Sequence, residues 1–175
     1  MSRQLVATLT TDSNGEATFT YTGTGIGKIG FDAKYGTFQS ETYEVIDANY
    51  YDDATSDQSS NYFVASGCSI TYSTNKYIAT MGSTYRFIEL RANSTLLNAL
   101  KGKDVKFKVT IETSTNTTVR VMVNGTATGD NSTSTDATIE TSTVTIPSDA
   151  TSVYFRIQGT VSSTFNFKDF IVYIV

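Results

Sequence analysis

The 175-residue sequence contains no histidine, no tryptophan, one cysteine and one proline. Histidine is the commonest general acid or base in enzymes, so its absence argues against hydrolysis, and spacing alone picks out no catalytic pair of carboxylates. Cys68 has no partner for an intrachain disulfide and no histidine to activate it as a nucleophile. We therefore expect a protein that is not an enzyme, in which Cys68 is a small apolar residue packed against a strand.

Charged residues are also scarce. They make up 17% of the sequence, with a formal net charge of −4 and an isoelectric point near 4.7. Such a chain lacks the positive potential that attracts a nucleic-acid backbone or an anionic membrane. No apolar stretch approaches the ~20 residues that span a bilayer, and the opening MSRQLVATLT lacks the apolar core of a secretory signal. We expect neither a nucleic-acid partner nor membrane insertion.

Residues that favour β-strands dominate what is present. Threonine and serine make up more than a quarter of the sequence, with 11 tyrosines and 10 phenylalanines. No segment shows the periodicity of a long amphipathic helix. The sequence predicts an all-β fold.

Residues 1–46 contain a turn at Asp12–Gly15, an alternating segment at 17–21, a glycine-rich corner and a second alternating segment at 29–35. The pattern TDSNGEATFTYT, followed by GKIGFDA, resembles the bacterial Ig-like repeats of invasin- and intimin-type adhesins and of virion surfaces. Sandwiches of this kind usually contain ~100 residues, about twice the length found here. The resemblance implies that residues 1–46 are a partial Ig-like domain, either the end of a stalk or an assembly segment that another copy completes.

Residues 47–175 alternate between apolar and polar side chains over roughly eight predicted strands, most regularly at 104–111, 119–123 and 153–157. A short helix is expected over 94–100, capped by Ser94, and the polar stretch 124–136 is expected to be a long loop or a weak hairpin. Strands of this number with turn signals between them predict a two-sheet jelly roll.

The order of elements in residues 47–175 adds a second resemblance. A YYDD segment, an SITY strand, LKGKDVKFKV, TVTIPSDATSVYFRI and a terminal FKDFIVYIV are together similar to a jelly roll of the carbohydrate-binding-module type. Such modules are appended to adhesins, glycan-active enzymes and phage tail proteins. The motifs are generic to strand-rich surface modules, so the resemblance indicates the fold more than the ligand.

The outer sheet faces supply the candidate binding residues. If Val153, Phe155 and Ile157 face the core, the intervening side chains lie on the opposite face of the sheet. A tyrosine ring stacks on sugar C–H groups, while guanidinium and amide groups bind hydroxyls. The predicted ligand-binding residues are Tyr154, Arg156, Gln158, Arg120 and Asn124. The alternative is an ordinary sheet face or a subunit contact.

Acidic residues cluster where the second domain begins, and carboxylate oxygens are the ligands that Ca²⁺ prefers. Sandwiches of the resembled type often hold a calcium ion that ties the first strand to the last. The predicted ligands of a structural Ca²⁺ are Asp47, Asn49, Asp52, Asp53 and Asp169. The alternative is that these are solvated turn residues.

Together these patterns predict a non-enzymatic surface module that binds a cell-surface glycan or receptor. It would act outside the cell or on a virion, as part of an adhesin or of a phage or virus fibre. The alternative is a purely structural virion or cell-envelope subunit, whose sheet faces and partial Ig-like segment make assembly contacts. A homo-oligomer is expected, because a partial sheet leaves unpaired edges and an uncovered apolar face.

Overall fold

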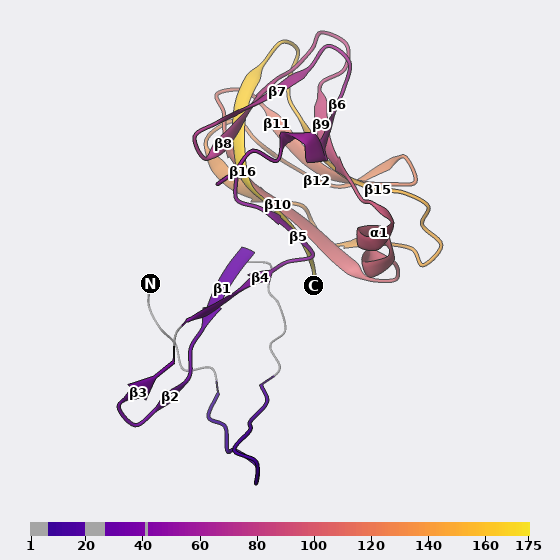
Figure 1. The fold of residues 1–175 in the computed structure, drawn as a ribbon. Coiled ribbons are helices and arrows are strands. Elements are labelled where there is room, and N and C mark those ends of the chain that lie inside the picture. Colours follow the sequence, from indigo (N-terminus) through magenta and orange to yellow (C-terminus); the bar gives the residue numbers. More distant parts are fainter. Residues whose placement is uncertain (1–6, 20–26, 41) are drawn as a thin grey trace.

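The computed structural model describes residues 7–19, 27–40 and 42–175, with the backbone alone described for 27–29 and 43–47. The N-terminal part contains β1 (Gly27–Phe31), β2 (Lys34–Tyr35), β3 (Phe38–Gln39) and β4 (Tyr43–Asp47). Strand β1 pairs with β4 and β2 pairs with β3, so these strands form two small sheets of their own (Figure 1). No described side chain before Tyr50 packs in the hydrophobic core. The Ig-like character of this part stays a prediction.

The rest of the chain forms two packed sheets. The first has seven strands in the order β13-β10-β16-β8-β7, with β14 beside β10 and β5 beside β16. These strands are β5 (Tyr50–Asp52), β7 (Ser69–Ser73), β8 (Lys76–Thr80), β10 (Asp104–Glu112), β13 (Ala137–Glu140), β14 (Val144–Thr145) and β16 (Thr164–Ile174). First and last strands of the sandwich, β5 and β16, are neighbours.

The second sheet has five strands in the order β12-β11-β15-β9-β6. They are β6 (Tyr62–Val64), β9 (Phe87–Arg91), β11 (Thr117–Val123), β12 (Thr126–Thr133) and β15 (Val153–Gln158). A 3₁₀ turn, η1 (Ser59–Asn61), and one helix, α1 (Ser94–Leu100), lie in the connections. The fold is an all-β jelly-roll sandwich, as the sequence predicts. Within the described residues, no helix is long and apolar enough to cross a membrane.

The core lies between the two sheets, and the alternation of the sequence fills it. On β15, Val153, Phe155 and Ile157 are fully buried, and β10 contributes its four alternate apolar residues from Val105 to Ile111. Aromatic rings join the two sheets, with Phe107 of β10 against Phe155 of β15 at 5.8 Å between ring centroids. Each large apolar side chain buried here stabilises the fold by about 1.5–3 kcal/mol. The predicted inward faces of β10 and β15 are confirmed.

Two local predictions change in detail. Asn93, and not Ser94, caps α1, because its side-chain oxygen accepts a hydrogen bond from the Leu96 N–H at 2.9 Å. The polar stretch 124–136 contains a strand, β12, that pairs with β11. Of the two alternatives predicted for this stretch, the hairpin is therefore observed and the long loop is not. Pairing with β11 supplies its order through backbone hydrogen bonds and side-chain contacts such as Thr118 to Ser132 at 2.8 Å. Apolar burial is therefore not needed to fix this edge strand.

Candidate functional site

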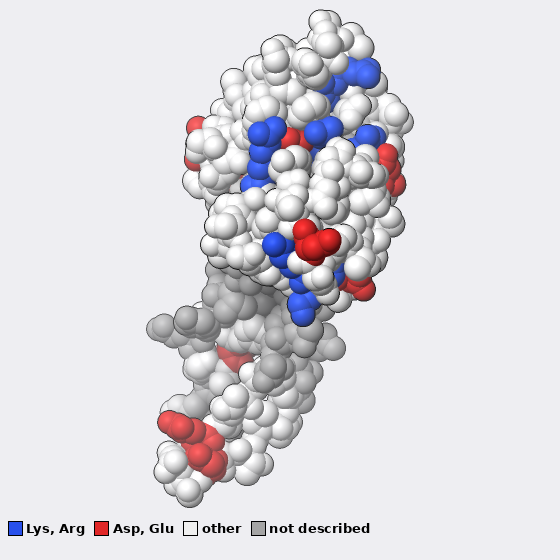
Figure 2. Space-filling view, turned by 90° about the vertical axis from the view of Figure 1, so that its right-hand side faces the viewer, with Lys and Arg blue, Asp and Glu red and all other residues white. Residues whose placement is uncertain are grey.

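Polar and aromatic side chains gather on the outer face of the five-stranded sheet. Figure 2 looks onto this side of the sandwich, where basic side chains lie on either side of a small acidic patch. The register places Arg156 of β15 opposite Glu89 of β9 and opposite Arg120 of β11. We call this surface the arginine face, and it consists of Phe63, Phe87, Glu89, Arg91, Arg120, Tyr154, Arg156 and Gln158.

Glu89 is the centre of the arginine face and is 1% exposed. Arg156 donates to its Oε2 atom from Nε at 2.9 Å, with Nη2 2.8 Å away, and Arg91 donates from Nε to Oε1 at 3.0 Å. A buried carboxylate needs such partners, because leaving it unpaired costs several kcal/mol. Two guanidinium groups share one carboxylate, so the cluster keeps one positive charge in excess.

Aromatic rings fix the planes of these guanidinium groups. The Arg91 Cζ atom lies 3.4 Å from the centroid of Phe63, and the Arg156 Cζ atom lies 3.7 Å from that of Phe87. Each stack contributes about 0.5–2 kcal/mol. Because a planar guanidinium held on a ring cannot rotate freely, its N–H donors are fixed in direction before any ligand arrives.

Arg120 sits opposite a β-bulge. In β12 the register shifts between Asn131, which faces Val119, and Thr128, which faces Val121, so two residues oppose Arg120. Gly129 at the bulge has a φ of +70°, and a Cβ atom there would meet the Val144 side chain at 2.6 Å. Only glycine fits this position.

The same bulge presents Asp130, whose Oδ2 atom lies 3.0 Å from Arg120 Nη2. The Nε atom of Arg120 is buried and has no hydrogen-bond partner among the described residues. An unsatisfied buried donor costs about 1–3 kcal/mol. The arginine face thus contains one buried N–H group whose hydrogen bond is unmet among the described residues.

The structure brings four of the five predicted binding residues together. Tyr154, Arg156 and Gln158 project from β15, and Arg120 joins them because β11 is the neighbouring strand. Asn124 lies beyond the end of β11, in the turn to β12, with a φ of +49°. Its side-chain oxygen accepts hydrogen bonds from Thr151 and Ser152, so it holds the turn to the loop before β15.

Four residues of the arginine face were not among the predicted binding residues, namely Phe63, Phe87, Glu89 and Arg91. A signal for two of them exists in the sequence, because Glu89 and Arg91 alternate within the apolar strand FIELR and so share a face. Their meeting with Arg156 depends on the β9–β15 register, which no local pattern specifies.

Two predicted calcium ligands are engaged by hydrogen-bond donors. Asp52 is 1% exposed; its Oδ1 atom accepts from the Ala54 N–H at 2.8 Å, and its Oδ2 atom accepts from the hydroxyls of Tyr62 and Tyr77 at 2.7 and 2.9 Å. Burial raises the pKa of both tyrosines, and the hydrogen bond to Asp52 raises it further. Asn49 accepts from the Ile174 N–H at 3.0 Å. These contacts tie the start of the sandwich to its core and to its last strand.

The other predicted calcium ligands are Asp47, Asp53 and Asp169, of which Asp53 and Asp169 lie near each other because each follows or precedes the paired residues Asp52 of β5 and Phe170 of β16. Asp53 accepts from the N–H and hydroxyl of Thr55, and Asp169 has a φ of +51° within β16. The side chain of Asp47 lies outside the described residues. Over the part of the chain that the structure describes, no group of three or more His, Cys, Asp or Glu residues could hold a metal ion. The calcium site stays a prediction, which a chelator titration of the melting temperature would test.

Cys68 is half-buried, and its thiol contacts backbone groups. The Sγ atom donates to the Tyr85 carbonyl oxygen at 3.0 Å and accepts from the Gly82 N–H at 3.3 Å. The thiol therefore holds two loops together beside the sheets.

By sequence the chain matches no protein-family model and no curated protein. By structure it is similar to the C-terminal family 22 carbohydrate-binding module of Clostridium thermocellum Xyn10B, with a TM-score of 0.54, 14% identity, and coverage of 71% of this chain and 91% of that one. The CBM22-1 xylan-binding domain of Paenibacillus barcinonensis Xyn10C gives a TM-score of 0.53 and 9% identity, covering 73% and 94% of the two chains. The CBM22-1–CBM22-2 tandem of the same protein gives 0.58 and 8%, covering 78% and 55%. This likeness shows the fold, a jelly roll of the carbohydrate-binding-module type.

Proposed function

We propose that the sandwich is a non-enzymatic glycan-binding module and that the arginine face is its binding surface. The observation that carries the proposal is a rigid set of donors: Arg91 and Arg156 are fixed by Glu89 and by aromatic rings, and Arg120 lies beside Arg156 on the neighbouring strand. Sugar hydroxyl and ring oxygens are acceptors that such donors bind.

The aromatic groups of this face suit the same ligand. Phe63 is 39% exposed, and Tyr154 is half-buried beside Arg91, whose Cζ atom lies 5.2 Å from the tyrosine centroid. Exposed ring surface packs against the apolar C–H groups of a sugar while neighbouring donors reach its hydroxyls. The structural neighbours include domains described as xylan-binding, which supports a glycan ligand for this fold. The setting we propose is outside the cell, in an adhesin or in a phage or virus fibre.

The test is a screen of the full chain against a broad panel of glycans and cell-wall polysaccharides, displayed multivalently so that weak single-site binding becomes visible. Arg120→Met removes the guanidinium group beside Arg156 and keeps most of the length of the side chain. We expect it to weaken binding at least tenfold with little change in melting temperature. Lys168→Met, on the opposite sheet, is the matched control and should bind as the wild type does. Equal binding by the two variants, or no saturable binding to any glycan, would contradict the proposal.

A second function is favoured by a specific observation in the N-terminal part. Tyr35 and Phe38 pair across the β2–β3 hairpin and are 88% and 79% exposed. Two large apolar rings side by side on a hairpin suit an assembly contact between copies of the chain. A structural subunit of a virion or cell envelope would use them in this way.

The measurement for this second function is the molar mass in solution by light scattering. The double variant Tyr35→Ser with Phe38→Ser should convert an oligomer into a monomer, whereas Tyr85→Ser, 54% exposed on the sandwich, should leave the mass unchanged. A wild-type chain that is already monomeric at high concentration would exclude the assembly contact.

A further inference from the structure

A cavity of about 510 Å³ opens beside the arginine face, where α1, η1 and β5 meet the end of β9. Figure 1 shows α1 and β5 at this end of the sandwich. The residues that line it are Asn49, Tyr50, Asn61, Leu90, Arg91, Asn93, Thr95, Leu96 and Ala99. Its volume lies within the ~300–1,000 Å³ typical of small-molecule sites. Arg91 belongs to both surfaces, so the cavity is continuous with the arginine face.

The polar lining is held in place by hydrogen bonds that use only one end of each asparagine side chain. Asn49 and Asn93 accept through their oxygens, from the N–H groups of Ile174 and Leu96. Asn61 donates its NH₂ group to Gln58 at 3.1 Å. Two NH₂ donors and one carbonyl acceptor therefore have no partner within the described part of the chain and are available to a ligand. A sugar ring offers hydroxyls that both donate and accept, which matches such a mixed set.

The charge of the cavity is positive and is not balanced within it. Among the described residues, Arg91 is the sole charged residue that lines it, and none of the lining residues is Asp or Glu. The Nε of Arg91 binds Glu89, but Arg156 binds the same carboxylate, and the terminal nitrogens of Arg91 have no hydrogen-bond partner in the described part of the chain. Two parallel N–H groups of a guanidinium match the geometry of a carboxylate.

We propose that this cavity is a second subsite of the glycan-binding surface and that it takes a carboxylated sugar, of the uronic acid type, whose carboxylate pairs with Arg91. The proposal rests on the proposed function and deepens it. The ligand is an acidic oligosaccharide that crosses the arginine face, with an acidic unit in the cavity. The same sugar with an alcohol in place of the carboxylate offers no counter-charge to Arg91 and binds more weakly.

The test uses the full chain and oligomers of galacturonic, glucuronic and mannuronic acid. Each is compared with the same oligomer after chemical reduction of its carboxylates to primary alcohols, so that only the charge and its acceptor oxygens differ. We expect at least one acidic oligomer to bind tenfold or more tightly than its reduced form, by calorimetry. In NMR spectra the side-chain NH₂ signals of the lining asparagines should shift during that titration.

Variants locate the effect. Ala99→Phe fills the cavity from the exposed side of α1. Asn98→Phe places the same ring on the preceding residue of the helix, which does not line the cavity. Arg91→Lys keeps the charge and loses the paired donors. The preference for the acidic form should disappear in Ala99→Phe, fall severalfold in Arg91→Lys and persist in Asn98→Phe, with melting temperatures as the control for folding.

The outcomes separate the two proposals. Equal affinity for acidic and reduced oligomers, or a preference that Ala99→Phe leaves intact, overturns the cavity subsite. If Arg120→Met still weakens binding at least tenfold in that case, the arginine face survives as the glycan site. Absence of binding to every acidic and neutral glycan overturns both.

Discussion

The charged side chains on the two outer faces of the sandwich differ in their burial and in how they are paired. On the arginine face, one carboxylate that is 1% exposed serves two arginines, and a third arginine keeps an unpartnered buried N–H. On the seven-stranded sheet, carboxylates that are about one third exposed meet lysines and neutral donors. We call that second surface the lysine face, and it consists of Lys76, Lys106, Lys108, Glu112, Glu140, Asn166, Lys168 and Tyr173.

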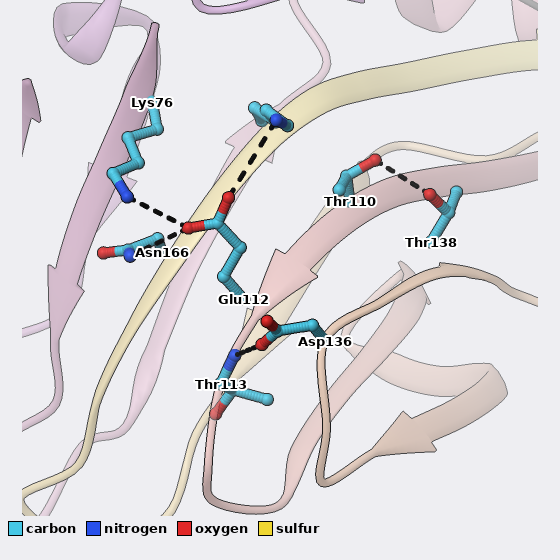
Figure 3. Close-up of polar contacts among 8 residues, drawn as sticks. Lys76, Thr110, Glu112, Thr113, Asp136, Thr138 and Asn166 are labelled. Atoms are coloured by element: carbon cyan, nitrogen blue, oxygen red, sulfur yellow. Dashed lines mark hydrogen bonds and ion pairs between the residues drawn. The ribbon is translucent and has the colours of Figure 1, made fainter. Parts of the chain in front are cut away.

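Each of the two carboxylates of the lysine face has a lysine and a neutral donor as partners. Glu112 accepts from Lys76 at 3.0 Å and from Asn166 at 3.1 Å, and Figure 3 shows both side chains directed at its carboxylate. Glu140 accepts from Lys106 at 2.7 Å and from the Tyr173 hydroxyl at 2.6 Å. Exposed pairs of this kind contribute about 0–1 kcal/mol each.

The difference teaches where to look for a binding surface. On the lysine face, solvent reaches the partly exposed carboxylates and lysines. On the arginine face the central carboxylate of Glu89 is buried, its two arginine partners are fixed, and the buried Nε of Arg120 has no acceptor among the described residues. The proposal of a binding surface on the arginine face rests on its fixed donors around a buried carboxylate, rather than on the number of charges.

The largest effect is expected from a substitution that removes the charge of Glu89, the central carboxylate of the arginine face. Glu89→Gln keeps the shape and leaves two guanidinium groups without a counter-charge, so the free energy of unfolding should fall by about 3–5 kcal/mol. The matching change on the lysine face, Glu112→Gln, should cost less than about 1 kcal/mol. Urea unfolding measures both, and equal losses would show that the two faces are energetically alike.

A smaller effect separates binding from stability. Phe87→Leu removes the ring under Arg156, worth about 1 kcal/mol of cation–π contact, and should weaken glycan binding about fivefold because the guanidinium is no longer fixed. Tyr173→Phe on the lysine face loses a hydrogen bond to Glu140, also worth about 1 kcal/mol. Its binding should equal that of the wild type. Parallel calorimetric titrations compare the two, and a loss of affinity in Tyr173→Phe would remove the distinction.

The smallest effect concerns pH and belongs to the lysine face. Hydrogen bonds from Lys76 and Asn166 lower the pKa of Glu112; burial alone would raise the pKa of Glu140, but its bonds from Lys106 and Tyr173 give a net lowering. A carboxyl whose pKa is lower in the folded state stabilises the fold above its unfolded pKa, near 4.5, and this contribution is lost as pH falls through the folded pKa.

Melting temperatures measured from pH 7 to pH 3 test that statement. Glu140→Gln should lower the melting temperature at pH 7 by about 2–4 °C at most, and the difference from the wild type should shrink below pH 4.5. A difference that stays constant over this range would show that Glu140 acts through packing and not through its charge.

Alternation along the sequence was enough to predict the fold and part of the site. It assigned Val153, Phe155 and Ile157 to the core, and it therefore assigned Tyr154, Arg156 and Gln158 to the outer face. Periodicity of two residues is a local property, so it can be read without knowing which strands are neighbours.

Pairing between distant strands could not be predicted in the same way. Glu89 meets Arg156 only because β9 lies beside β15 in one register, 67 residues apart in sequence. The bulge at Gly129 that presents Asp130 to Arg120 is likewise a property of two paired strands. The cap of α1 differs from its prediction by one residue, because asparagine and serine are both good caps and the backbone decides between them.

The pairing of β5 with β16 also has a mechanical meaning. The chain enters the sandwich at Asn49, beside the end of the adjacent strand β16. Two hydrogen bonds join these ends: the Asn49 N–H donates to the Val172 carbonyl oxygen at 2.8 Å, and the Ile174 N–H donates to the Asn49 side-chain oxygen at 3.0 Å. A force that pulls these two ends apart opens the antiparallel ladder from its end, so its hydrogen bonds break in succession and not all at once. Under tension, β5 is therefore the strand that peels away first.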